Sequence, residues 1–210
     1  MKPRVGFGCV LAAICGCIGA GIIIYSRVTS PGAIVRDMPV PLTTNIPSAR
    51  IYLNEGERLK VAMPNGSARE VRSLLNVLGP QTFGSFVWND AGVAPGPVWA
   101  RVDLAAQTIS VFRGSDEIGT AVIVYGTSNK PTPIGWFAIK DKRRDYYSRS
   151  YDAPMPWMLR LTDDGVALHA SRVRAGYATH GCIGTPAEFA SKMFSAMNRG
   201  DQVIIIGAPK

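Results

Sequence analysis

The stretch VWARVDLAAQTISVFRG, residues 98–114, decides the fold class. Apolar and polar side chains alternate along it, with Val102 and Leu104 before a short turn and Ile109 and Val111 after it. Such alternation is typical of strands with one buried face, because successive side chains point to opposite faces of a sheet. The stretch therefore predicts a β-hairpin and, with it, a domain that is mainly β.

The β pattern continues toward the C-terminus. Short apolar runs bounded by turn residues predict further strands at 121–126, 136–140, 158–161, 166–169 and 202–206. The stretch from Asp141 to Asp152 is polar, charged and rich in tyrosine, and it is predicted to be a mobile loop.

Two segments show helical spacing instead. Residues 185–188, Thr-Pro-Ala-Glu, have the form of a capping box with proline at the first helical position. Phe189, Met193 and Met197 then recur on one face, which predicts a helix that ends by Gly200 and packs on the core. Upstream, apolar residues also recur at helical spacing over 71–78, before a Gly-Pro stop.

The N-terminal segment from Val5 to Ser26 is apolar and uncharged, and it follows Lys2 and Arg4. About 20 apolar residues can span a bilayer, and the basic flank favours a cytoplasmic N-terminus with the remainder exported. We therefore expect a transmembrane anchor. A cleaved signal peptide is the alternative, although Ile22–Tyr25 makes a poor cleavage region.

The net charge is compatible with a protein that works at the cell envelope. Lys2, Arg4, Arg27 and Arg36 precede the first acidic residue, Asp37, so the rest of the chain carries +4 of the formal net charge of +8. A mildly basic surface suits an anionic cell wall or membrane face. Without a recognition motif or interleaved aromatics it does not indicate a nucleic-acid partner.

The candidate chemistry lies in one stretch, Thr179-His180-Gly181-Cys182, with His169 upstream. The chain has 2 histidines, both found here, and Cys182 is the one of its 4 cysteines outside the apolar N-terminal segment. An exported thiol without a disulfide partner is open to oxidation, so its presence indicates that the thiol is used. A thiol beside a base, just ahead of a helix N-terminus, is the arrangement of a cysteine nucleophile.

Two other interpretations compete with a nucleophile. His169, His180 and Cys182 could bind zinc together with Asp164 or Glu188, but the histidine and cysteine that are two apart form a poor ligand pair without a second Cys or a third His. A non-catalytic wall-binding module is the second alternative, and it would not need His169 and Cys182 together.

Four ordered blocks carry a resemblance to a known family. They are Lys130–Phe137 (KPTPIGWF), Ala153–Arg160 (APMPWMLR), Asp164–His169 (DGVALH) and Thr179–Ile183 (THGCI). In these blocks the chain from Val98 to Ile206 resembles the L,D-transpeptidase catalytic domain (YkuD type) of bacterial cell-wall enzymes. The resemblance implies a β-sandwich or barrel with a short helix after the cysteine.

The resemblance also implies an activity. An L,D-transpeptidase transfers acyl groups between peptidoglycan stem peptides without ATP, metal or organic cofactor. Cys182 would be the nucleophile and His169 the general base, oriented by the backbone carbonyl of Ala170. Backbone N–H groups around His180, Gly181 and Cys182 would form the oxyanion hole. An L,D-carboxypeptidase, in which water resolves the thioester, is the alternative within the same chemistry.

One position departs from the family pattern. Family members commonly carry Arg or Asn two residues after the nucleophile, where this chain has Gly184. Arg172 and Arg174, in the segment between His169 and Cys182, are the candidates for holding a substrate carboxylate in its place.

These observations divide the chain into four parts. We expect residues 1–27 to be an anchor or signal peptide, 28–49 a Pro/Ser/Thr-rich linker, 50–97 a small accessory region without an assigned role, and 98–208 the catalytic domain. The protein would then be located in the cell envelope, as a periplasmic domain anchored in the inner membrane or as an exported protein.

Overall fold

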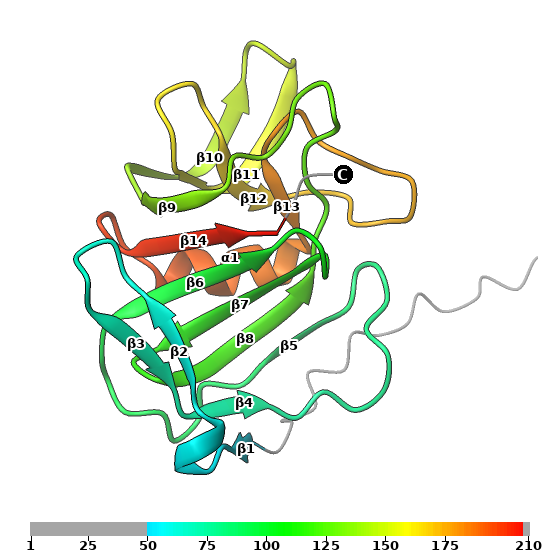
Figure 1. Ribbon diagram of the computed structural model, residues 1–210. Helices are drawn as coiled ribbons and strands as arrows, with labels where there is room; N and C mark the ends of the chain where they lie inside the picture. The colour runs from blue at the N-terminus through cyan, green and yellow to red at the C-terminus, as the bar shows by residue number, and fades with distance from the viewer. Residues whose placement is uncertain (1–49, 208–210) are drawn as a thin grey trace, which may run out of the picture. The chain divides into compact units, whose positions relative to one another are not determined.

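The computed structural model describes residues 50–207, all within one compact unit (Figure 1). In this part of the chain, an 8-stranded sheet has the order β1-β4-β8-β7-β6-β14-β9, with β5 also paired to β8. A 4-stranded sheet has the order β10-β11-β12-β13, and β2 and β3 form a 2-stranded sheet. The mainly β fold with a short helix after Cys182 is confirmed.

The elements have the following bounds. The large sheet contains β1 (Arg50–Tyr52), β4 (Ser73–Leu75), β5 (Phe86–Trp88), β6 (Val98–Asp103), β7 (Thr108–Arg113), β8 (Asp116–Val122), β9 (Gly135–Ala138) and β14 (Gln202–Ile206). The 4-stranded sheet contains β10 (Asp141–Ser148), β11 (Ala153–Arg160), β12 (Ala167–Ala170) and β13 (Ile183–Thr185). The remaining elements are η1 (Glu55–Glu57), β2 (Leu59–Ala62), β3 (Ala68–Val71) and α1 (Ala187–Ala196).

The predicted hairpin is the centre of the large sheet. β6 and β7 pair antiparallel, with Val102 opposite Ile109, and both side chains are fully buried. β14 joins the other edge of β6 in parallel, and so closes the domain with the predicted C-terminal strand. The alternating pattern read from the sequence therefore marks the inner face of the sheet correctly.

Helix α1 covers one face of this sheet, behind β6 and β14 in Figure 1. Phe189, Met193 and Met197 are fully buried in the main core, as predicted. The predicted capping box is wrong: Pro186 is the N-cap residue and has no side-chain cap bond, while the Thr185 hydroxyl donates to the His169 carbonyl at 3.4 Å. Thr185 is the last residue of β13, and its hydroxyl bonds the neighbouring strand β12 instead of capping the helix.

The opposite face of the sheet is partly covered by the hairpin of β2 and β3 (Figure 1). Val71 packs with the stacked rings of Trp99 and Phe112, whose centroids lie 4.3 Å apart. The helix predicted over 71–78 is wrong. Arg72 and Ser73 hydrogen-bond instead to Asp116, a partner distant in sequence, and this pairing draws the segment into the sheet as β4.

The second sheet corrects another prediction. Residues 141–148 form strand β10, paired along its length with β11, and not a mobile loop. Local composition hides the pairing because half of the β10 side chains are exposed and they do not alternate regularly with buried ones. β11 then pairs with β12, with Leu159 opposite Leu168, so the predicted strand pair around the turn at 163–165 is confirmed.

The predicted membrane segment lies outside the described residues. In residues 50–207 there is no helix long and apolar enough to cross a membrane.

Candidate active site

His169 lies on strand β12, and Cys182 directly precedes strand β13, which pairs with β12. The strands pair in parallel, with His169 opposite Gly184, and Cys182 stands two residues before Gly184. Side chains two residues apart on a strand share a face. Ala167 therefore shares a face of β12 with His169, and Cys182, just before β13, packs against the cluster that contains Ala167.

The imidazole of His169 is buried and its tautomer is fixed. Nδ1 lies 2.8 Å from the carbonyl oxygen of Ala170. A carbonyl can only accept, so Nδ1 carries the proton and Nε2 keeps its lone pair. Burial lowers the pKa of His169 from its usual 6.5, against the opposing effect of this hydrogen bond. The ring is thus a neutral base in the resting protein.

The thiol of Cys182 packs at the edge of a small cluster formed by Met155, Met158 and Ala167. Its Sγ is 3.8 Å from the carbonyl oxygen of Gly165. Burial raises the pKa of this thiol; a hydrogen bond from the Ala167 backbone lowers it, and the negative charge of Asp164 raises it further. The resting thiol is therefore protonated and needs a base.

The expected help from a helix dipole is not found at Cys182. The three-residue strand β13 and Pro186 separate the cysteine from the first residue of α1. The effect of a helix dipole fades within about one turn of the helix end. The pKa of Cys182 is raised, not lowered, so the thiol depends on a base, for which His169 is the candidate.

The turn before the cysteine is held by contacts that the sequence did not single out. Gly181 has a φ of +105°, which L side chains rarely adopt. The buried Thr132 hydroxyl donates to the Gly181 carbonyl at 2.9 Å and accepts from the Gly126 N–H at 3.0 Å. Thr179 Oγ1 donates to the Cys182 carbonyl at 2.5 Å. Thr132 belongs to the KPTPIGWF block, and this membership is the feature of the sequence that could have indicated its role.

The space around this turn is tight. A Cβ atom at Gly126 would lie 2.1 Å from the Lys130 carbonyl oxygen and 2.8 Å from Gly181 Cα. Glycine at 126 therefore allows the segment after β8 to approach the turn before Cys182, and so contributes to its position.

His180 lies apart from the buried pair. Its ring is exposed and stacks on Tyr151, with centroids 4.6 Å apart and planes 14° apart. Arg172 and Arg174 are also exposed, in the segment between β12 and Thr179, where Arg174 lies over the ring of Tyr177 at 5.8 Å. The structure therefore groups His169 with Cys182 and leaves both arginines on the surface.

Gly184 fills a position without room for a side chain. A Cβ atom there would lie 2.6 Å from Ser171 Cβ and 2.8 Å from Val124 Cγ2. The Gly184 backbone also exchanges hydrogen bonds of 2.8 and 3.0 Å with Val124. Ser171 and Val124 thus occupy the space that an Arg or Asn side chain at position 184 would need.

A metal centre receives no support from the described side chains. In residues 50–207, no three His, Cys, Asp or Glu residues are grouped so that they could hold a metal ion.

Comparison with known proteins identifies the family. The family model of the L,D-transpeptidase catalytic domain, YkuD, matches residues 97–205, about half of the chain. The chain belongs to this family. Its sequence is 30% identical over 121 residues to L,D-transpeptidase 1 of Mycobacterium tuberculosis strain H37Rv, and the same match is found in strain CDC 1551. The alignment covers 50% of this chain and 48% of that protein, so the chain spans about half the length of the curated relatives it matches.

Solved structures show the same fold. The chain is similar to an L,D-transpeptidase from Stackebrandtia nassauensis, with a TM-score of 0.50 and 23% identity over 54% of this chain and 57% of that one. It is also similar to LdtMt1, an L,D-transpeptidase solved in complex with imipenem, with a TM-score of 0.50 and 24% identity over 52% of this chain and 58% of that one.

Proposed function

We propose that this protein is a cysteine acyltransferase that carries out L,D-transpeptidation on peptidoglycan stem peptides. Membership of the L,D-transpeptidase family supports the substrate class. The observation that carries the mechanism is the neutral, Nδ1-protonated imidazole of His169, two residues along β12 from Ala167, against whose cluster Cys182 packs. The catalytic domain comprises residues 98–208, and 50–97 form an accessory region.

Acylation begins with the transfer of one proton. His169 Nε2 takes the proton of the Cys182 thiol as Sγ attacks the carbonyl carbon of the L-centre in the donor stem. The tetrahedral intermediate then collapses, the C–N bond breaks, and the leaving D-amino acid takes the proton from His169. A thioester on Cys182 remains. The raised pKa of the thiol and the lowered pKa of the imidazole keep both groups neutral until substrate binds.

Backbone N–H groups around His180, Gly181 and Cys182 stabilise the oxyanion of this intermediate. A preorganised donor of this kind is worth about 10²–10³-fold in rate. The positive φ of Gly181 and the Thr132 bond to its carbonyl fix the orientation of the peptide planes in the turn. Their rigidity supports the assignment because catalytic donors must not need to reorganise.

Transfer to the acceptor reverses these steps. The amine of a neighbouring meso-diaminopimelate attacks the thioester while His169 takes its proton, and the thiol is released and reprotonated. One amide bond is exchanged for another, so no ATP or cofactor enters the balance. Arg172 and Arg174 are proposed to hold a substrate carboxylate from the rim of the site.

The location of the reaction follows from the N-terminal sequence. We propose that residues 1–27 anchor the protein in the inner membrane, or direct its export, and that 28–49 extend the domain into the periplasm. This part of the proposal rests on the apolar run after Lys2 and Arg4.

Covalent labelling tests the assignment of the nucleophile. A carbapenem should add one adduct mass to the wild-type chain, at Cys182 by peptide mapping. Cys182→Ala should remove the adduct, whereas His180→Ala should retain it as a matched control. An adduct that persists in Cys182→Ala would end this assignment.

A further inference from the structure

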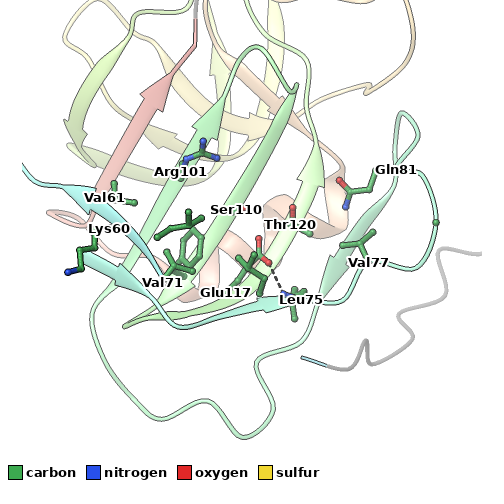
Figure 2. A pocket seen from close by; sticks show the side chains of 14 residues that line it. Lys60, Val61, Val71, Leu75, Val77, Gln81, Arg101, Ser110, Glu117 and Thr120 are labelled. Carbon is green, nitrogen blue, oxygen red and sulfur yellow. Dashed lines mark hydrogen bonds between the residues drawn. The ribbon is translucent and has the colours of Figure 1, made fainter. Parts of the chain in front are cut away.

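A cavity of about 630 Å³ lies on the large sheet, on the face that carries Trp99 and Phe112 (Figure 2). The hairpin of β2 and β3 and the segment after β4 form its walls, and β6, β7 and β8 its floor. Its volume is within the range of about 300–1,000 Å³ that is usual for small-molecule sites. None of its lining residues belongs to β10–β13, so it is separate from the site of Cys182.

The floor of the cavity carries an ordered polar row. Arg101 pairs with Ser110, and Ser110 with Thr120, so that three polar side chains stand side by side on β6, β7 and β8. Neighbouring strands are about 4.8 Å apart. The row thus presents a guanidinium and two hydroxyls at regular spacing. In the adjacent row Phe112 pairs with Glu117, which places a phenyl ring beside a carboxyl group.

Two groups around the cavity have hydrogen-bonding capacity to spare. Gln81 extends from the loop after β4 toward the sheet (Figure 2), and its Nε2 is buried without a partner in the described structure. A buried donor left unsatisfied costs about 1–3 kcal/mol. Of the five N–H donors of a guanidinium, Arg101 uses Nη2 for Asp103, at 2.9 Å. Both side chains therefore have N–H donors that could bond an acceptor on a ligand.

Two cations and one acid line the cavity, and the ammonium of one of them, Lys60, points away from it (Figure 2). Arg101 is paired with Asp103, while the Glu117 carboxylate accepts from the Leu75 N–H at 2.8 Å and from the Ser110 hydroxyl. Burial raises the pKa of Glu117 and favours its neutral form. A neutral ligand with both donors and acceptors matches this lining better than a strong anion or cation.

An extended peptide has no backbone partner on the floor. β8 is paired with β7 on one edge and with β4 and β5 on the other, so its edges are already used. The walls are aliphatic, with Leu59, Val61, Val71, Leu75 and Val77 around the polar row. A ligand needs apolar C–H surface for these walls together with polar groups for the floor.

We propose that this cavity binds an N-acetylhexosamine unit. The ring hydroxyls and the amide of such a sugar match Ser110, Thr120 and Glu117, and its acetyl carbonyl is an acceptor for Gln81 or Arg101. The C–H face and the methyl group match the aliphatic walls. The biological source of the sugar, the glycan strand that bears the stem peptides, rests on the proposed function. Residues 50–97 together with β6, β7 and β8 would thus hold the glycan while the stem reaches Cys182.

Calorimetry on the full chain, carrying Cys182→Ala to prevent turnover, tests the proposal with N,N′-diacetylchitobiose. Cellobiose, which lacks the acetamido groups, is the matched control and should bind at least about ten-fold more weakly. Gln81→Leu and Arg101→Met should each weaken chitobiose binding by about ten-fold, since each removes a hydrogen-bond partner. Arg113→Met is the control variant, because Arg113 pairs with Asp90 outside the cavity. Unfolding curves confirm that each variant is folded.

Several outcomes would overturn the proposal: no binding of chitobiose, equal binding of cellobiose, or equal loss in Arg113→Met. Binding unchanged by both Gln81→Leu and Arg101→Met would also overturn it. Carbapenem acylation, measured with Cys182 intact, keeps the two proposals apart. If acylation fails while chitobiose binds, the proposed function is wrong and the sugar site stands; if acylation succeeds without sugar binding, the reverse holds.

Discussion

Thr132 Oγ1 donates a hydrogen bond of 2.9 Å to the carbonyl oxygen of Gly181, the residue before the proposed nucleophile. The same hydroxyl accepts from the Gly126 N–H, and Thr132 is 1% exposed. One buried hydroxyl thus connects the segment after β8 to the turn at Gly181. Thr132 is a positioning residue in this account because it touches the turn and not the substrate.

Thr132→Val keeps the shape of the side chain and removes its hydroxyl. We expect a loss of stability of about 1–3 kcal/mol from the unpaired carbonyl and N–H groups. The acylation rate of the folded protein by a carbapenem should fall roughly 10–100-fold, as small displacements in an active site do. Thr132→Ser should restore most of the rate. A rate that Thr132→Val leaves unchanged would mean that the hydroxyl serves stability alone.

The two histidines should differ sharply in their effect. A placed general base typically contributes about 10²–10⁴-fold, so His169→Ala should lose acylation rate on that scale at neutral pH. His180→Ala should lose far less, because its exposed ring stacks on Tyr151. Single-turnover kinetics with unfolding controls would measure both. If His180→Ala is the worse variant with its fold intact, the roles must be exchanged.

The pH dependence of acylation should report the burial of His169. The reaction needs the neutral imidazole, and burial lowers the pKa of His169 from 6.5. The rate should therefore hold from neutral pH down past 6.5 and fall only at more acidic pH. Pre-steady-state rates from about pH 5 to 8, with His169→Ala as the control that lacks this limb, would test it. A limb centred above 6.5 would contradict the assignment.

Gly184 should not tolerate any side chain, even a single methyl group. A Cβ atom at this position meets Ser171 Cβ at 2.6 Å and Val124 Cγ2 at 2.8 Å. We expect Gly184→Ala to destabilise the fold by about 1–3 kcal/mol through overpacking. Gly56→Ala is the matched control, because nothing lies within 4 Å of its added Cβ. Equal denaturant midpoints for the two variants would show that Ser171 and Val124 yield easily.

Much of the fold could be predicted because its signals are local. Alternation at Val102 and Ile109 specifies the central strands, and the spacing of Phe189, Met193 and Met197 specifies the buried face of α1. Strands β4 and β10 could not be predicted in this way. β4 is drawn into the sheet by Asp116, which is far away in sequence. β10 has little apolar alternation, and only one of its eight side chains is fully buried.

In the candidate site, too, local features could be predicted from the sequence and long-range contacts could not. His169, Ala170 and Cys182 were identified from short motifs, and the Ala170 carbonyl does orient the imidazole. The raised pKa of Cys182 and the role of Thr132 depend on burial and on contacts between segments far apart in sequence. Such contacts leave no periodic trace, so the sequence predicts a thiolate favoured by a helix dipole where burial in fact raises the pKa of the thiol.

The most direct test of the central claim is turnover of purified tetrapeptide muropeptides, read by mass spectrometry of both products and protein. We predict crosslinked dimers with loss of the terminal D-amino acid, and a tripeptide thioester on Cys182 that is trapped by rapid acid quench. His169→Ala should suppress both signals. Tripeptides without dimers would show hydrolysis in place of transpeptidation, and dimers formed by Cys182→Ala would contradict the thioester mechanism itself.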